Sequence, residues 1–170
     1  MREAENYFTF NKLNDKESQK ARREFFIVDT EFLADYIPTM EWMVEFTDEF
    51  EKWWDSLDEE EQISVDGVVG ALENLGPLLP HPYSSAIRNS RHGHMRELRI
   101  QHRGDPYRIF YAFDPRRVAI LLLGGKKGGD DERWYREYIP IADRLYDDHL
   151  DALRREGLIQ EGGKEEFSNG

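Results

Sequence analysis

The sequence predicts an α+β domain with the element order β-α-α-β-β-β-α, in which helices pack on a small antiparallel sheet. Two periodicities support this prediction: apolar residues recur at helical spacing in the first and last parts of the domain, and strand-like segments lie between them. The strand-like segments are residues 41–46, 95–102, 107–113 and 118–123. The turns that separate the last three are too short for crossover connections, so these strands are expected to form an antiparallel meander.

The first strand and the two helices after it have clear boundary signals. In residues 41–46 (EWMVEF) the apolar residues share one face. Thr47 predicts the N-cap of the first helix, and Asp58 with Glu61 three residues later predicts a capping box for the second. Gly76, followed by proline, predicts the end of the second helix. These signals predict an N-terminal helical hairpin.

The second half of the domain is predicted to contain a loop, a buried strand and a C-terminal helical region. The stretch LLPHPYSS holds two of the seven prolines and is predicted to be a loop, whereas the strand 118–123 (VAILLL) is apolar on both faces and is expected at the centre of the sheet. A glycine-flanked loop, GGKKGG, comes directly after it. Residues from about 131 to 155 then predict a C-terminal helical region, with Pro140 in the first turn of its second part.

The composition sets the organisation of the chain. Residues 1–39 differ in composition from the rest of the chain, so we predict an extension of unknown role there, a domain at 40–156 and a mobile tail at 157–170. The absence of cysteine excludes disulfides, thiol catalysis and cysteine-ligated zinc. No long apolar run or signal peptide pattern is present, so we expect a cytoplasmic protein without a membrane partner.

The charge distribution is uneven. The formal net charge is -12, yet the segment 88–127 holds ten Lys or Arg residues against three acidic ones, a net charge of +7. The 13 basic and 32 acidic residues elsewhere give -19. A local basic patch of this kind indicates a strongly negative partner, because binding depends on the local field and not on the net charge.

Arg99 and Arg108 are the strongest candidates within this basic segment. They lie on consecutive strands, and a hairpin turn between them would place them nearly opposite each other. Two adjacent guanidinium groups repel unless they hold an anion, and their planar donors match phosphate oxygens. We expect Arg108 to project from the sheet, so that its replacement by alanine leaves the fold intact. The alternative is that Glu97, Asp105 and Asp114 neutralise both arginines on the surface.

The GGKKGG loop is the second candidate. Its glycines would let the backbone approach a ligand closely, and its two lysines add positive charge. The spacing differs from that of a nucleotide-binding phosphate loop, so we exclude nucleoside triphosphate binding. A flexible, solvated turn remains the alternative.

Histidines and aromatic residues give weaker signals. His92 and His94 alternate, but an HxH pair without a third ligand rarely binds metal, so we predict no metal site. The tryptophans at 53–54 are expected in the core. Tyr111 and Tyr135 could stack on a nucleobase if they lie beside the basic patch.

Five blocks spread over about residues 40–151 carry a resemblance. They are VEFTDEFEKWWDSLDEEEQ, LENLGPLL, SRHGHMRELRIQHRG, YRIFYAFDPRRVAILLLGGKKGG and WYREYIPIADRLYDDHL. In this order they resemble the HigB-like toxins of the RelE/ParE toxin superfamily. The resemblance implies a RelE-like fold and a bacterial type II toxin–antitoxin system, in which the toxin cleaves messenger RNA, usually on the translating ribosome. It also implies a tightly bound cognate antitoxin, and a reaction that uses no metal ion and no cofactor.

The resemblance also assigns roles to residues. It implies that Arg99 and Arg108 are catalytic and hold the scissile phosphate, while Lys127 supplies transition-state charge or a proton. Lys126 and Gly128 depart from the Asp or Asn and the Thr that are usual in the family's loop. The residues implied to contact RNA or the ribosome are Arg91, Arg96, Arg103, Tyr111, Lys126 and Tyr135.

Two other functions remain open at this stage. The ParE branch of the superfamily shares the fold but poisons DNA gyrase and cleaves no RNA, and it would not require Arg99, Arg108 and Lys127 to converge. The second alternative is a catalytically inactive interaction module, whose basic face docks an acidic partner. Residues 1–39 could then act as a built-in inhibitor.

Overall fold

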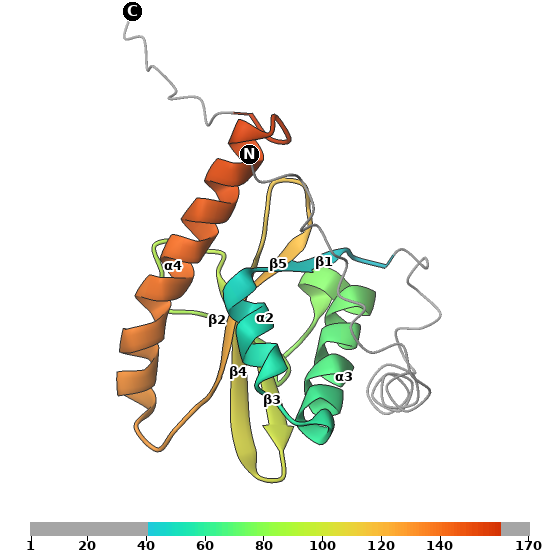
Figure 1. The fold of residues 1–170 in the computed structure, drawn as a ribbon, viewed down its shortest axis with the longest axis vertical. Coiled ribbons are helices and arrows are strands. Elements are labelled where there is room, and N and C mark those ends of the chain that lie inside the picture. Colours follow the sequence, from blue (N-terminus) through green and yellow to red (C-terminus); the bar gives the residue numbers. More distant parts are fainter. Residues whose placement is uncertain (1–40, 161–170) are drawn as a thin grey trace, which may run out of the picture.

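The computed structural model describes residues 41–160, so the expected N-terminal extension and most of the expected tail lie outside the described residues. The elements are β1 (Val44–Phe46), α2 (Asp48–Asp55), α3 (Glu59–Leu75), the 3-10 turn η1 (Gly76–Leu78), β2 (Ser84–Ala86), β3 (Arg96–His102), β4 (Asp105–Phe113), β5 (Ala119–Lys126) and α4 (Asp131–Arg155). The predicted α+β class is confirmed, with one strand more than expected (Figure 1).

The sheet has the strand order β1-β5-β4-β3-β2. The predicted antiparallel meander is confirmed for β3, β4 and β5. β1 pairs with β5 in the parallel direction, so the sheet is mixed and not wholly antiparallel. β2 lies at the end of the stretch predicted to be a loop and pairs with β3, with Ser84 opposite Leu98. The loop backbone joins the sheet because its N–H and C=O groups need partners: the Tyr83 carbonyl accepts from the backbone N–H of Arg99 at 2.8 Å.

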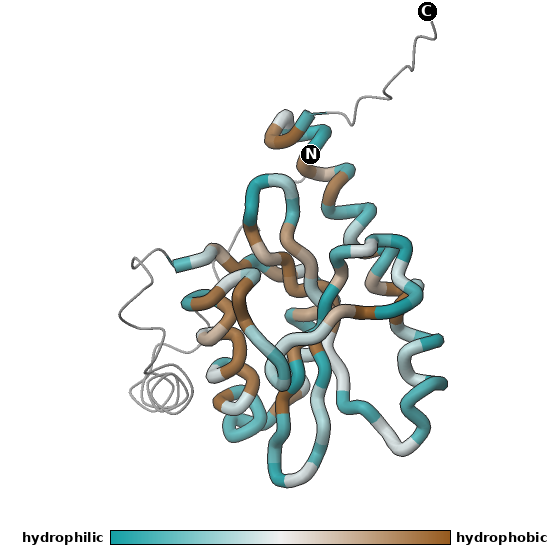
Figure 2. The backbone as a smooth tube through the Cα atoms, turned by 180° about the vertical axis from the view of Figure 1, so that it is seen from behind, coloured by the Kyte–Doolittle hydropathy of each residue, from teal (hydrophilic) through white to brown (hydrophobic). Residues whose placement is uncertain are grey.

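Helices cover both faces of the sheet (Figure 1). The helical hairpin of α2 and α3 packs on one face, and its core includes Phe50, Trp54, Val69, Leu72, Leu98 and Ile109. α4 packs on the other face, where the core includes Phe110, Ile120, Leu122, Trp134, Leu145 and Tyr146. β5 contributes side chains to both cores, which confirms that it is covered on both faces. It lies inside the sheet between β1 and β4, whereas the middle strand is β4 and not β5 as expected. In Figure 2 the strands carry mostly apolar residues, the helices alternate between apolar and hydrophilic residues, and most loops are hydrophilic.

The predicted helix caps are confirmed. Thr47 Oγ1 accepts from the backbone N–H of Phe50 at 3.2 Å. Asp58 and Glu61 form a capping box in which each side chain accepts from the other residue's backbone N–H at 2.8 Å. Gly76 ends α3 with φ at +53°, and its lack of a Cβ leaves room for the indole of Trp42. These contacts fix where α2 and α3 begin and where α3 ends.

Two consecutive glycines at the end of β5 make room for tryptophan side chains. β5 extends to Lys126, so the first half of the predicted GGKKGG loop is strand. A Cβ atom on Gly124 would lie 2.1 Å from the ring of Trp53, and one on Gly125 would lie 3.1 Å from the ring of Trp134. These two glycines therefore let α2 and α4 approach β5 from opposite faces of the sheet. We had expected the glycines to let the backbone approach a ligand instead.

Replacing Gly124 with alanine is expected to lower the free energy of unfolding by about 1–3 kcal/mol, because the added methyl group overpacks the contact with Trp53. Gly128→Ala is the matched control, since a Cβ at Gly128 meets no atom within 4 Å. Urea denaturation of both variants checks the prediction. Equal midpoints for Gly124→Ala and the wild type would contradict it.

α4 is one continuous helix with Pro140 inside it, and not the two parts that we predicted. Its buried face includes Ala142, Leu145, Tyr146 and Leu153. Neither α4 nor any other helix between residues 41 and 160 combines the length and apolar character needed to cross a membrane.

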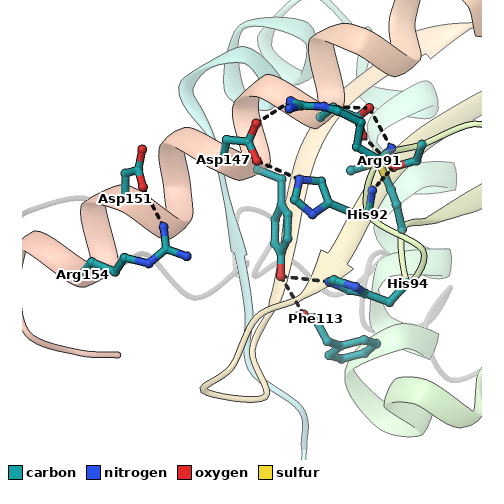
Figure 3. A network of polar contacts seen from close by, with 11 residues as sticks. Arg91, His92, His94, Phe113, Asp147, Asp151 and Arg154 are labelled. Atoms are coloured by element: carbon teal, nitrogen blue, oxygen red, sulfur yellow. Dashed lines mark hydrogen bonds and ion pairs between the residues drawn. The ribbon is translucent and has the colours of Figure 1, made fainter. Parts of the chain in front are cut away.

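The segment that leads into β3 is tied to α4 by polar contacts (Figure 3). Asp143, which is 4% exposed, accepts hydrogen bonds from Ser90 Oγ at 2.6 Å and from the backbone N–H of Arg91 at 3.1 Å. One turn later, Asp147 pairs with the guanidinium of Arg91 and lies 2.8 Å from Nε2 of His92. These contacts hold the segment at a fixed position against the helix.

Candidate functional site

Arg99 on β3 and Arg108 on β4 lie directly opposite each other, as predicted. Opposed residues of an antiparallel pair place their side chains on the same face of the sheet. This face is the one that α4 covers, because Phe110, two residues along β4 from Arg108, packs against Trp134 of α4. The two arginines therefore lie on neighbouring strands of one face, next to α4.

Arg108 is buried, with 3% exposure, so the expectation that it projects freely from the sheet is wrong. Its Nη1 donates to the carbonyl oxygen of Tyr107 at 2.9 Å, and its Nε lies 3.9 Å from Oε1 of Glu97. Nε is buried and makes no hydrogen bond within the described part of the chain. Leaving a buried donor without an acceptor costs about 1–3 kcal/mol, and more for a charged group. An anion that reached Nε would recover this free energy.

The side chain of Arg99 is half-buried, and its guanidinium makes no hydrogen bond or ion pair with residues 41–160. Its backbone N–H donates to the carbonyl of Tyr83 at 2.8 Å, which fixes the main chain of Arg99 at the edge of β3 that faces β2. Arg99 and Arg108 thus place one unpaired cation beside one buried cation whose hydrogen bonds are incomplete. This arrangement favours an anion that both guanidinium groups can reach.

Lys127 joins the two arginines from the end of β5. Its backbone N–H donates to the carbonyl of Pro106 at 2.8 Å, which holds it beside the start of β4. Its Nζ pairs with Asp131 at 2.8 Å and lies 5.3 Å from the ring centre of Tyr135. The hydroxyl of Tyr135 in turn donates to Oε2 of Glu97 at 2.7 Å. We call Arg99, Arg108 and Lys127, with Glu97 and Tyr135, the basic cluster.

Glu97 links the members of this cluster, although from the sequence it was expected only as a surface charge that neutralises the arginines. It is 5% exposed and accepts hydrogen bonds from Ser85 Oγ at 2.9 Å and from Tyr135. The available signal was strand alternation, which puts Glu97 and Arg99 on the same face. Burial, together with the hydrogen bond to Glu97, raises the pKa of Tyr135 to about 12, so its phenol remains a proton donor at neutral pH.

Three residues predicted to bind RNA have ion-pair partners outside the basic cluster. Arg91 is tied to α4 as described above, Arg103 pairs with Glu60, and Lys126 Nζ lies 2.5 Å from Asp105. Exposed ion pairs of this kind contribute about 0–1 kcal/mol, so they can be exchanged for phosphate contacts at little cost. The RNA-contacting role of these residues stays a prediction.

Arg96 and Tyr111 lie opposite each other on the other face of the sheet, the face that α2 and α3 cover, with Tyr111 in its core and Arg96 half-buried. Arg96 Nε donates to Ser84 Oγ at 3.0 Å, and this hydroxyl lies 2.7 Å from the hydroxyl of Tyr111. Tyr111 has 0% exposure. The expectation that Tyr111 stacks on a base is therefore wrong, because its ring packs inside the protein. Arg96 likewise lies apart from the basic cluster.

One group of side chains has the spacing of a metal site. Ligand atoms of Glu45, Asp114 and His149 lie within 4.8 Å of one another. The guanidinium of Arg116 already bridges this group, because its Nη2 lies 2.7 Å from both carboxylates. Nε2 of His149 lies 2.9 Å from Oδ2 of Asp114, the same oxygen that Arg116 contacts. We therefore assign these four residues to a salt-bridge network.

Acid is expected to destabilise the protein through Asp114 and Asp147. Burial opposes the charge of each carboxylate, but hydrogen bonds from His149 and Arg116 lower the pKa of Asp114 below its usual 3.8, and His92 and Arg91 do the same for Asp147. A lowered folded-state pKa stabilises the fold above pH 3.8, and this stabilisation is lost as the pH falls through the folded-state values. The melting temperature should thus fall steeply below about pH 4. The melting temperature of the Asp147→Asn variant should fall less steeply with pH than that of the wild type. Parallel curves of melting temperature against pH would contradict the prediction for Asp147.

Residues 52–147 match the family described as "Phage derived protein Gp49-like (DUF891)", and this range includes all members of the basic cluster. "Putative toxin HigB3" of Mycobacterium tuberculosis (strain ATCC 25618 / H37Rv) is 43% identical over 100 residues, which cover 59% of this chain and 86% of the relative. "Putative toxin HigB2" of the same strain is 41% identical over 99 residues, which cover 58% of this chain but only 49% of that relative. These relatives confirm the resemblance to HigB-like toxins.

Proposed function

Because the chain belongs to the phage-derived Gp49-like family, we propose that it is the toxin component of a type II toxin–antitoxin system and cleaves messenger RNA without a metal ion. The names of both relatives include the word toxin, and this supports the first half of the proposal. The proposed partners are a cognate antitoxin protein and the translating ribosome in the cytoplasm, with messenger RNA as the substrate.

The opposed pair of Arg99 and Arg108 carries the second half of the proposal. Arg99 has no partner for its side chain within residues 41–160, and Arg108 has a buried donor without an acceptor. Lys127 adds a third positive charge to the same cluster. An RNA phosphate fits this arrangement, because its oxygens can accept hydrogen bonds from the arginine donors that have no acceptor within the described residues.

The reaction is a transesterification that these groups can promote. The ribose 2′-oxygen attacks the adjacent phosphorus, a new P–O2′ bond forms and the P–O5′ bond breaks. The products are a 2′,3′-cyclic phosphate and a free 5′-hydroxyl. Arg99 and Arg108 stabilise the additional negative charge of the phosphorane, which is the kind of electrostatic term that contributes most to catalysis.

The two proton transfers are assigned to Glu97 and Lys127. Glu97 is a buried carboxylate on the cluster and accepts the proton of the 2′-hydroxyl. Lys127 Nζ donates a proton to the leaving O5′ after its ion pair with the exposed Asp131 opens. Tyr135 holds Glu97 in place through its hydrogen bond and is a positioning residue. Each transfer of this kind contributes about 10²–10⁴-fold to a rate.

Induced expression in a bacterial host, with mapping of messenger RNA 5′ ends, tests the proposal. The wild type is compared with the triple variant in which Arg99, Arg108 and Lys127 are replaced by alanine. We expect growth arrest and new in-frame cleavages with the wild type alone, and 5′-hydroxyl ends at the cleavage sites. Circular dichroism of the purified triple variant must show that it is folded, because Arg108 is buried.

Other outcomes would overturn the proposal. Growth arrest without cleavage would favour a gyrase poison. Absence of arrest by both the full chain and a chain that begins at Met40 would favour an inactive interaction module. Arrest by the shorter chain alone would instead indicate that residues 1–39 inhibit the toxin.

A further inference from the structure

A cavity of about 670 Å³ lies between α4 and the segment from β2 to β3. The Ile87 and Ile139 side chains are among its apolar walls, and its polar walls include Glu97, Glu132 and Arg136. Pockets that bind small molecules commonly measure about 300–1,000 Å³ and combine apolar walls with a few polar groups. The cavity is therefore large enough for a nucleoside.

The cavity shares two residues with the basic cluster. Glu97 and Tyr135 line the cavity, and both also connect the cluster. Nε of Arg108 lies 3.9 Å from Oε1 of Glu97, and Nζ of Lys127 lies 5.3 Å from the ring centre of Tyr135. A nucleotide whose phosphate binds at the cluster would thus have the cavity within reach of its base.

The charge of the cavity differs from that of the cluster. Two arginines, Arg88 and Arg136, and two glutamates, Glu97 and Glu132, line it, so their formal charges cancel. No hydrogen bond or ion pair within residues 41–160 engages the side chains of Arg88, Glu132 or Arg136. A neutral site with unused donors and acceptors suits an uncharged polar base, whereas the basic cluster suits a phosphate.

The cavity is also held open by the fold. Two of its lining residues, Arg88 and Asn89, immediately precede Ser90 and Arg91, which are hydrogen-bonded to Asp143 of α4. Asn89 has φ at +69°, a left-handed conformation that asparagine tolerates better than most residues. A site held in this way loses little entropy when a ligand binds.

We propose that this cavity is a nucleobase subsite and that it selects guanine. The inference rests on the proposed function, because Glu97 is assigned there as the acceptor of the 2′-hydroxyl proton. Since Glu97 also lines the cavity, the base belongs to the nucleotide that carries the attacking hydroxyl. Guanine presents N1–H and N2–H donors that the Glu132 carboxylate accepts. Its O6 and N7 acceptors match an arginine fork, which Arg136 supplies one helical turn further along α4.

Binding of ribonucleoside 3′-monophosphates tests the subsite without requiring cleavage. Isothermal titration of the full chain is carried out with guanosine, adenosine and cytidine 3′-monophosphates and with inorganic phosphate. The guanosine compound is expected to bind roughly 10- to 100-fold more tightly than phosphate, because contacts to one base are commonly of that size. Glu132→Gln and Arg136→Gln should each remove most of this advantage and leave phosphate binding unchanged. Arg133→Gln is the matched control, since Arg133 lies in the same helical turn but does not line the cavity.

The outcomes separate this inference from the proposed function. Equal binding of guanosine 3′-monophosphate and inorganic phosphate would overturn the subsite, whatever the cleavage experiment shows. Equal binding of all three nucleotides, or an unchanged preference in both Gln variants, would overturn the selection of guanine. Failure of the proposed function appears elsewhere: phosphate does not bind, and no cleavage of messenger RNA is detected.

Discussion

Arg99→Ala is expected to lower messenger RNA cleavage about 100- to 1,000-fold, which is the usual effect of removing one donor that stabilises transition-state charge. The melting temperature should change by no more than about 2 °C, because Arg99 makes no hydrogen bond or ion pair with residues 41–160 through its side chain. The measurement is the rate of cleavage by purified protein in a translation extract, together with thermal unfolding of the same preparation.

Arg103→Ala is the matched control for this effect. Arg103 lies on the same hairpin and carries the same charge, but its guanidinium is exposed and pairs with Glu60. Removing it should lower cleavage much less than removing Arg99. Equal losses in the two variants would show that the arginines act only through the general positive field, and that the opposed pair has no special role.

Arg116→Ala should have the largest effect on stability, a loss of about 3–5 kcal/mol in the free energy of unfolding, because it leaves buried carboxylates without their cation. The side chains of Glu45 and Asp114 are 3% and 0% exposed, and Arg116 Nη2 lies 2.7 Å from each. His149 remains beside Asp114 and keeps the loss toward the lower end of this range. The melting temperature should fall by roughly 10 °C for a domain of this size.

Urea denaturation of Arg116→Ala and of a control, Arg144→Ala, measures this loss. Arg144 is exposed on α4, and its replacement should change the unfolding free energy by less than about 0.5 kcal/mol. If Arg116→Ala matched the control, the network would contribute nothing to stability. Restoring stability with the double variant Arg116→Ala/Glu45→Gln would confirm that the uncompensated charge is the cause.

The sequence predicted those features of the site that depend on local geometry. The short hairpin turn placed Arg99 opposite Arg108, because a tight turn leaves the two strands little freedom of register. Capping residues likewise marked the starts of α2 and α3. Signals of this kind involve residues only a few positions apart, so they can be recognised in a single sequence.

Features that depend on contacts between distant segments were missed. The burial of Arg108 and Glu97 results from α4, which begins more than 20 residues after Arg108 along the chain. Tyr111 alternates correctly for a strand, but nothing in its own segment shows which face the helical hairpin covers. The parallel pairing of β1 with β5 also joins residues far apart in the sequence.

The pairing of β1 with β5 affects the order in which the molecule can assemble during synthesis. The first strand has its partner only after the chain has been extended to Leu121, and the contact of Tyr135 with Glu97 forms later still. Pairing between such distant segments is a slow step in folding. A nascent chain therefore carries Arg99 and Arg108 before it carries the residues that complete the cluster around them. The proposed catalytic arrangement is therefore one of the last parts of the domain to form. If the proposed function holds, a ribosome that synthesises this protein is not exposed to a finished site until the domain is nearly complete.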